Sequence, residues 1–182
     1  MEFRIIGEEQ GAEVRWLWNY CFEKADHPFY QWFFRRRFET ANVLGGFVEG
    51  ALKCCLHLMP YQLQLRGKAV PADYIVGVAS MPDARGGGAV AGLLTASLGE
   101  MRRRGRPVSI LMPSRAGFYY PYGWELCYHQ LHYSVPMADL AGISRRAGEF
   151  AMVGTVEAGE LLRLDEAYRR YAKTVPRWFG LR

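Results

Sequence analysis

The sequence contains no long apolar run and no cysteine framework. No apolar stretch approaches the roughly 20 residues that a transmembrane helix requires. The N-terminus becomes acidic soon after Met1 and lacks the basic and apolar segments of a secretory signal peptide. The cysteines Cys21, Cys54, Cys55 and Cys127 are not spaced as a metal knuckle or a set of disulfides. These absences predict a cytoplasmic protein with free thiols that binds neither a membrane nor a metal ion.

Acidic residues are fewer than basic residues, 18 against 23, so the formal net charge is +5. The basic runs at 35–37 and 102–104 each end a predicted helix, where positive charge complements the helix dipole. No nucleic-acid recognition motif accompanies these runs, so we expect no nucleic-acid partner, although a basic nucleic-acid binder remains an alternative. A phosphorylated cofactor would also suit the positive charge.

Size and composition exclude a disordered chain and argue against two full domains. The chain has 182 residues, of which 50% are hydrophobic and 23% charged, as in an ordinary globular protein. A chain of this size buries roughly 70% of its extended surface, which one hydrophobic core can accomplish. The sequence therefore predicts one main domain.

The hydrophobic pattern predicts an α/β chain with a mixed sheet. Strands are expected at 3–6, 42–49, 51–65, 69–80, 108–112 and 127–135, with tight turns at 49–50 and 66–67. Helices are expected at 8–23, 28–38, 83–104 and 159–173, with a short helical turn at 118–120. The continuous apolar strand at 108–112 is of the kind buried on both faces. Three successive strands precede the long helix, an order that differs from an alternating dinucleotide-binding fold.

A glycine cluster between the strand at 69–80 and the next helix is the most informative segment. Gly86, Gly87 and Gly88 leave backbone N–H groups uncovered, and the helix N-terminus adds a positive partial charge. Arg85 would stand over the same anion. A flexible turn would account for one glycine but not for three in a row, so we expect a phosphate or pyrophosphate site.

The same glycines also satisfy the dinucleotide fingerprint G-x-G-x-x-A over residues 86–91. That fingerprint requires its first glycine directly after a strand and an acidic residue about 20 positions later. Here residues 81–85 intervene, and the next predicted strand ends in Pro113, Ser114 and Arg115. A nucleotide-binding oxidoreductase is therefore an alternative with weaker support.

A second interpretation fits both ends of this region. The pattern Arg85-x-x-Gly88-x-Val90 resembles the coenzyme A loop of GNAT acetyltransferases, R/Q-x-x-G-x-G/A, although Val90 departs from its last position. The block AGFYYPYGW at 116–124 resembles the family's A-x-x-F-Y-x-x-x-G-F. The resemblance covers roughly residues 1–136. It implies a GNAT fold, in which helices flank both faces of a mixed, mostly antiparallel central sheet, and acetyl-coenzyme A as the cofactor.

Within that family, residues 69–78 and 101–114 are similar to the enhanced-intracellular-survival type of acetyltransferase. Such proteins carry a second GNAT-like domain and a sterol-carrier-like domain. We therefore expect a GNAT domain at 1–156, followed at 157–182 by a helix and tail that begin a truncated second module. The apolar stripe of that helix would pack on a further module or on a second copy of the chain, so the sequence allows a homo-oligomer.

The resemblance implies an N-acetyltransferase that moves an acetyl group to a primary amine by direct attack on the thioester. The acceptor would be a small-molecule or peptide amine, aminoglycoside-like or lysine-like. The backbone of 78–80 would hold the pantetheine arm as an added strand, and the glycine loop would bind the pyrophosphate. The residues expected to bind coenzyme A are Val78, Ala79, Ser80, Arg85, Gly86, Gly87, Gly88, Ala89 and Val90.

Tyr119 occupies the position of the family's phenolic acid, with an aromatic core residue as the alternative role. The enhanced-intracellular-survival type uses a tyrosine at the later position, which is Trp124 here, and an indole has no useful proton to give. Local candidates for a general base are Asp73, Glu125 and His132. Because Val90 and Trp124 depart from the patterns, a coenzyme A-binding module with weak or lost catalysis is a further alternative.

Overall fold

The computed structural model describes residues 1–127, 132–141, 166 and 170. The chain forms two compact units, Met1–Glu125 and Leu126–Arg182. In the second unit the described residues include a short helix, α4 (Met137–Leu140), and Glu166 and Arg170 are helical. The domain boundary expected at 156–157 and most of the helix expected at 159–173 lie outside the described residues.

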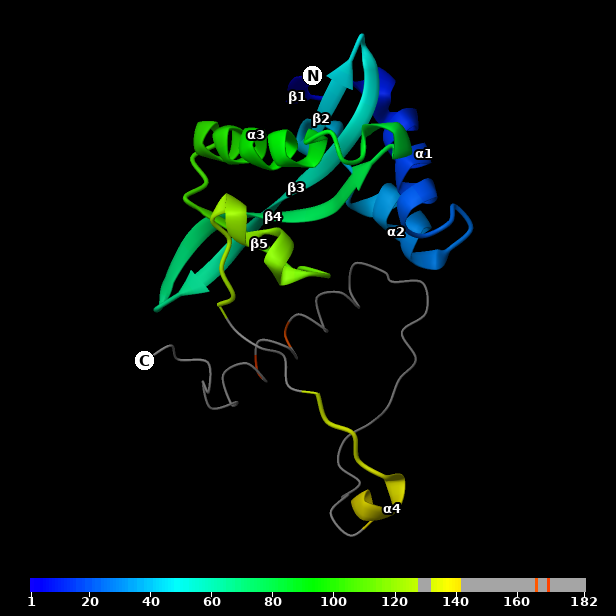
Figure 1. The fold of residues 1–182 in the computed structure, drawn as a ribbon. Coiled ribbons are helices and arrows are strands. Elements are labelled where there is room, and N and C mark those ends of the chain that lie inside the picture. The colour runs from blue at the N-terminus through cyan, green and yellow to red at the C-terminus, as the bar shows by residue number, and fades with distance from the viewer. Residues whose placement is uncertain (128–131, 142–165, 167–169, 171–182) are drawn as a thin grey trace. The chain divides into compact units, whose positions relative to one another are not determined.

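The first unit is built on a five-stranded sheet whose strands follow one another in chain order (Figure 1). The strands are β1 (Glu2–Ile5), β2 (Val43–Val48), β3 (Ala51–Leu65), β4 (Lys68–Ser80) and β5 (Val108–Leu111). The first four strands pair antiparallel, and β5 pairs parallel to β4. The prediction of a mixed, mostly antiparallel sheet is confirmed. An antiparallel meander is not the alternating parallel wind of a dinucleotide-binding fold, so the oxidoreductase alternative has no support.

Helices cover both faces of this sheet, as expected (Figure 1). Helices α1 (Gly11–Cys21) and α2 (Pro28–Arg36) pack on one face, and α3 (Ala89–Arg103) packs on the other. Since successive strand residues point to opposite faces, Cys54 joins the core under α3 while Cys55 joins the core under α1 and α2. The two helical layers thus bury two separate apolar clusters.

Two tight turns connect the meander. Glu49–Gly50 has φ of 51° and 81°, and Arg66–Gly67 has φ of 48° and 80°. Two successive residues with positive φ form the two-residue hairpin turn that matches the twist of antiparallel strands. Both turns therefore lie where the sequence predicts them.

Three sequence predictions are wrong in detail. Helix α3 begins at Ala89 and not at residue 83, because Gly86 and Gly88 have φ of 77° and 78°, which a helix does not allow. Strand β5 is only half-buried and not buried on both faces, because β4 is its only strand neighbour among the described residues. Of the strand expected at 127–135, residues 127 and 132–135 are described, and none of them is in a strand.

A bulge in β4 lies next to α1. Cys55 pairs with Ala79 and His57 pairs with Val76, so β4 carries one extra residue between these pairs. Within the bulge, Gly77 has φ of 59°, and a Cβ added there would lie 2.4 Å from a ring carbon of Trp18. Only glycine therefore fits between the strand and this ring.

We expect Gly77→Ala to lower the free energy of unfolding by about 1–3 kcal/mol, because the new methyl group overpacks against Trp18 and its backbone angle is strained. Urea unfolding followed by circular dichroism measures the change. The matched control is Gly99→Ala, since Gly99 lies exposed in α3 and its Cβ would have no neighbour within 4 Å. Equal stabilities of the two variants would show that the bulge tolerates a side chain.

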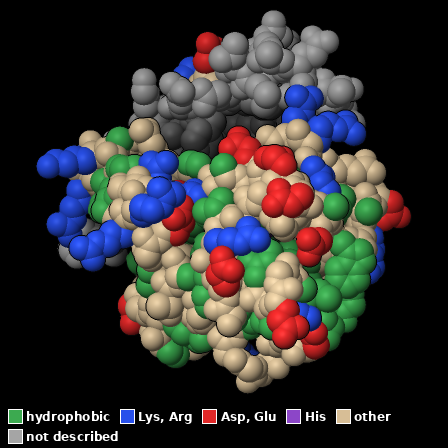
Figure 2. Space-filling model, turned by 90° about the horizontal axis from the view of Figure 1, so that it is seen from above, with side chains coloured by type: hydrophobic (Ala, Val, Ile, Leu, Met, Phe, Trp, Pro, Cys, Tyr) green, Lys and Arg blue, Asp and Glu red, His purple; other side chains and the backbone are tan. Residues whose placement is uncertain are grey.

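The surface is mixed in charge on the face that Figure 2 presents. Lys and Arg side chains alternate there with Asp and Glu, apart from one group of basic side chains toward the left edge. Within the described part of the chain, no helix is long and apolar enough to cross a bilayer.

Candidate active site

The glycine loop connects the end of β4 to the start of α3. Met81 N–H donates to the carbonyl of Lys53 at 2.8 Å, and Lys53 Nζ lies 2.6 Å from Asp83 Oδ2. These contacts tie the first half of the loop to β3. Pro82–Ala84 form a single 3₁₀ turn, after which the left-handed Gly86 and Gly88 lead the backbone into the helix.

The second half of the loop presents a row of backbone donors. Among the described residues, no carbonyl or side chain accepts a hydrogen bond of good geometry from the N–H groups of residues 86–91, and the next N–H, that of Gly92, donates to the carbonyl of Gly88. A Cβ at Gly86 or Gly88 would meet nothing within 4 Å. Uncovered donors at a helix N-terminus are the usual means by which proteins bind phosphate groups. This geometry supports the sequence prediction of an anion site.

Arg85 lies beside the end of β4. Its guanidinium donates to the carbonyl of Ser80 at 3.3 Å and lies 3.9 Å from the sulfur of Cys21 and 6.0 Å from the ring centre of Tyr20. The side chain therefore joins the C-terminal end of α1 to β4, a contact that no sequence pattern indicates. These contacts hold its charge beside the end of β4, directly before the loop.

Strands β4 and β5 stop pairing before β4 ends. Their pairing ends at Ile75 and Leu111, while β4 continues to Ser80. Residues 76–80 of β4 thus have no strand partner on this side among the described residues. In an unpaired strand edge, alternate N–H and C=O groups face outward and can pair with an extended ligand. Val78, Ala79 and Ser80 lie on this edge, directly before the glycine loop.

Tyr119 is positioned by two short 3₁₀ helices after β5, Ala116–Phe118 and Tyr120–Tyr122. It packs against the same apolar cluster as Val78 at the end of β4 and Val90 at the start of α3. Burial raises the pKa of its phenol above the ordinary value of 10. The phenol therefore keeps its proton at neutral pH, which is what a proton donor requires.

The indole of Trp124 is engaged in structural contacts and has no role as an acid. Its Nε1 donates to Ser109 Oγ at 3.1 Å, and its ring meets the ring of Tyr119 edge-on, with centroids 6.2 Å apart. The indole supports the ring of Tyr119 and uses its only N–H on β5.

The three candidate bases have different surroundings. Asp73 is fully buried on β4, where burial raises its pKa, and its Oδ1 lies 3.4 Å from Arg106 Nε. Glu125 is exposed at the end of the first unit, and His132 is exposed in the second unit.

His57 is a buried residue that the sequence did not mark as unusual. It lies on β3 beneath α1 and α2, and the rings of Trp18, Phe33 and Phe38 meet it edge-on at 5.3, 5.4 and 6.0 Å. Neither ring nitrogen makes a hydrogen bond of good geometry with the described residues. Burial lowers the pKa of His57 to about 4, despite an opposing contact with the backbone of Val76.

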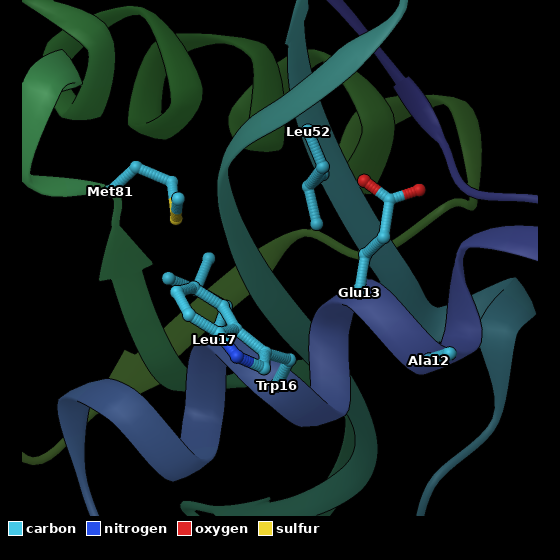
Figure 3. A pocket seen from close by; sticks show the side chains of 6 residues that line it. All are labelled: Ala12, Glu13, Trp16, Leu17, Leu52 and Met81. Atoms are coloured by element: carbon cyan, nitrogen blue, oxygen red, sulfur yellow. The ribbon is translucent and has the colours of Figure 1, made fainter.

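A half-open pocket of ≈290 Å³ borders the loop on the α1 side (Figure 3). Its lining is apolar except for Glu13, and comprises Ala12, Glu13, Trp16, Leu17, Leu52 and Met81. In Figure 3, Met81 and Leu52 extend toward the α1 side chains from the opposite wall. Met81 belongs to the first half of the glycine loop, so the pocket borders that half. Among the residues with described positions, no group of three His, Cys, Asp or Glu could hold a metal ion.

Comparison with known proteins gives a consistent result. The model of a family described as an acetyltransferase (GNAT) domain matches residues 2–127. No protein with a curated description matches the chain.

Many solved structures share the fold, and three of them illustrate the likeness. A GCN5-related N-acetyltransferase from Kribbella flavida is 24% identical, with a TM-score of 0.61 over 67% of this chain and 32% of that chain. Eis1 from Mycobacterium abscessus is 22% identical, with a TM-score of 0.55 over 68% of this chain and 31% of that chain. A GNAT family acetyltransferase from Brucella melitensis in complex with acetyl-CoA is 17% identical, with a TM-score of 0.55 over 69% and 82%. The chain therefore spans about a third of the length of the first two.

Proposed function

Because this chain belongs to the GNAT acetyltransferase family, we propose that it is an N-acetyltransferase that transfers the acetyl group of acetyl-coenzyme A to a primary amine. The observation that carries the proposal is the run of free N–H groups at residues 86–91, placed directly after the unpaired edge of β4. A nucleotide diphosphate and an extended amide-bearing arm are the two chemical features that these adjoining surfaces fit.

The residues present fit acetyl-coenzyme A, which would supply the acetyl thioester. The N–H groups of the glycine loop would bind its diphosphate, and the lack of side chains at Gly86, Gly87 and Gly88 leaves room for the phosphates to approach. The edge at Val78, Ala79 and Ser80 would hold the arm in an extended form. Binding of this kind orients the two reactants, which is a large part of the rate gain available to such an enzyme.

Tyr119 would supply the proton that the departing thiolate needs. Its phenol packs on the cluster shared by the end of β4 and the start of α3, and burial keeps it protonated. The pocket beside the loop would contact the acceptor, and the carboxylate of Glu13 favours a cationic, amine-bearing molecule there. An aminoglycoside-like or lysine-like amine has this chemistry. The proposal includes membership of the enhanced-intracellular-survival type, which is supported by the fold shared with Eis1.

Gly87→Val tests the assignment of the loop. The backbone of Gly87 is outside the left-handed region, and its Cβ would meet only the Ala84 carbonyl at 3.9 Å, so the fold accepts a side chain there. The added side chain would occupy the space of the phosphates, and we expect coenzyme A to bind at least about tenfold more weakly, as for the loss of one charge-assisted hydrogen bond. Isothermal titration calorimetry measures the affinity.

Gly99→Val is the matched control, since it places the same side chain on the exposed side of α3. It should bind coenzyme A as the wild type does. Native circular dichroism together with unchanged affinity in Gly87→Val would remove the loop from the site. Release of free thiol in the presence of a panel of amines tests transfer itself. Tight binding of coenzyme A without thiol release from any amine would instead favour a coenzyme A-binding module.

A further inference from the structure

A second pocket lies at the end of α3 that is remote from the glycine loop. It has a volume of ≈510 Å³ and is lined by the last turn of α3, the connection to β5, and β5 itself, with the residues Leu98, Met101, Arg102, Gly105, Arg106, Pro107 and Ser109. Helix α3 has 15 residues, which corresponds to a length of about 22 Å. The pocket is therefore distinct from the proposed acetyl-transfer site.

Arg102 provides a free cationic group on one wall of this pocket. Its neighbour Glu100 is already engaged, since its carboxylate lies 2.7 Å from the guanidinium of Arg103 and 2.6 Å from that of Arg104. No carboxylate among the described residues pairs with Arg102. A guanidinium that lines a pocket without a partner is available to an anionic ligand.

Arg106 is the second cation, and the buried carboxylate of Asp73 holds it in place. Its Nε lies 3.4 Å from Oδ1 of Asp73, which is fully buried. The pair has the distance of an ion pair but not the geometry of a hydrogen bond, and both Asp73 oxygens and Arg106 Nε remain buried without hydrogen bonds in the described structure. Buried polar atoms are rarely left so, and an additional ligand or ordered water would normally complete such a cluster. Asp73 orients Arg106, while the outer N–H groups of the guanidinium are left to the pocket.

The remaining wall combines one hydroxyl group with apolar side chains. Ser109 Oγ accepts a hydrogen bond from Trp124 Nε1, so its own proton is free to be donated. Leu98, Met101 and Pro107 supply the apolar surface. Asp73 offsets at most one of the two arginine charges, so the pair keeps a net positive charge, which suits a monoanion.

We propose that this pocket binds an organic monocarboxylate, with the carboxylate between Arg102 and Arg106 and its apolar chain against Leu98, Met101 and Pro107. A guanidinium presents parallel N–H groups that match the two oxygens of a carboxylate. The hydroxyl of Ser109 completes the polar side of the site. A ligand bonded to Ser109 would be connected to Trp124 through the hydrogen bond between Ser109 and Trp124.

Hexanoate is the probe that tests the proposal, with the full chain in isothermal titration calorimetry. We expect saturable binding of hexanoate, and at least about tenfold weaker binding of the uncharged hexanamide. Arg102→Gln should weaken hexanoate binding by a similar factor. Arg103→Gln is the matched control, because it removes the same charge one residue away, from a side chain that does not line the pocket.

Tryptophan fluorescence adds a readout at the pocket. Hexanoate should change the emission of the wild type, and Trp124→Phe should lose that change while it still binds hexanoate in the calorimeter. Any one of three results would overturn the proposal: no saturable binding of hexanoate at millimolar concentration, equal binding of hexanamide, or equal losses in Arg102→Gln and Arg103→Gln. None of these measurements depends on acetyl transfer.

Discussion

Replacement of Tyr119 by phenylalanine should lower kcat for acetyl transfer by about 10²–10⁴-fold, the usual contribution of a general acid. The change removes one proton donor and almost no volume, so the packing of the ring against the α3 core persists. The KM for acetyl-coenzyme A should change little, because the phenol would act mainly in the transition state. Steady-state thiol release at saturating amine measures both constants.

The pH dependence of kcat gives an independent check of the same role. Activity requires the protonated phenol, so the rate should fall as pH rises through its pKa. Because burial raises that pKa, the alkaline limb should lie above the ordinary tyrosine value of 10, and Tyr119→Phe should lose it.

Two companion variants make the result specific. Tyr120→Phe removes the same hydroxyl from the exposed neighbouring ring and should leave kcat unchanged. Trp124→Tyr places a phenol at the later position of the motif. Full activity of Tyr119→Phe together with a gain in Trp124→Tyr would assign the acid role to the later position. If neither change alters the rate, Tyr119 is a packing residue and solvent protonates the thiolate.

His57 should make the folded protein sensitive to acid. Its pKa is about 4 in the folded chain, against an ordinary value of 6.5, so the unfolded chain binds a proton from pH 6.5 downward while the folded chain does not. The contribution of neutral His57 to the free energy of unfolding is fully present above pH 6.5 and is lost as pH falls toward 4. This loss amounts to about 3 kcal/mol, which is a large part of a typical domain's free energy of unfolding.

His57→Leu should remove this dependence. Leucine has a similar size, and it replaces an imidazole without good hydrogen bonds between the rings of Trp18, Phe33 and Phe38. We expect the free energies of unfolding of the two proteins to diverge by about 3 kcal/mol between pH 7 and pH 4, in favour of the variant at low pH. Urea titrations across this range measure the difference, in which the titration of all other groups cancels. Parallel curves would contradict the assignment.

The regular elements were predictable because each has its own local signal. Alternation gave β1 to β4 to within two residues at each end, and helical spacing gave α1 and α2. For helix α3 the sequence predicts a start at residue 83, six residues too early, where the structure has a separate 3₁₀ turn at Pro82–Ala84. The left-handed angles at Gly86 and Gly88 delay the helix, and glycine adopts such angles without a steric cost.

Other features of the site depend on residues that are distant in the sequence. The bulge at Gly77 arises where Trp18 of α1 crosses β4. The bond from Arg85 to Ser80 places its charge near Cys21, which no spacing in the sequence indicates. Asp73 was considered for its acidity, yet its environment is set by Arg106, which follows α3. Motifs therefore located the loop and Tyr119, while the electrostatic surroundings required the fold.

The adjacent residues Cys54 and Cys55 make the sheet a partition with a thiol on each side. Cys54 belongs to the core under α3 and Cys55 to the core under α1 and α2, and burial raises the pKa of both, that of Cys54 to about 11. Neither thiol can react until its own layer opens. The rates at which an alkylating reagent modifies the two sulfurs would therefore report separately how often each helical layer lifts from the sheet. Two adjacent residues thus report local opening independently: Cys54 for the layer that carries the glycine loop, and Cys55 for the layer that carries the aromatic core.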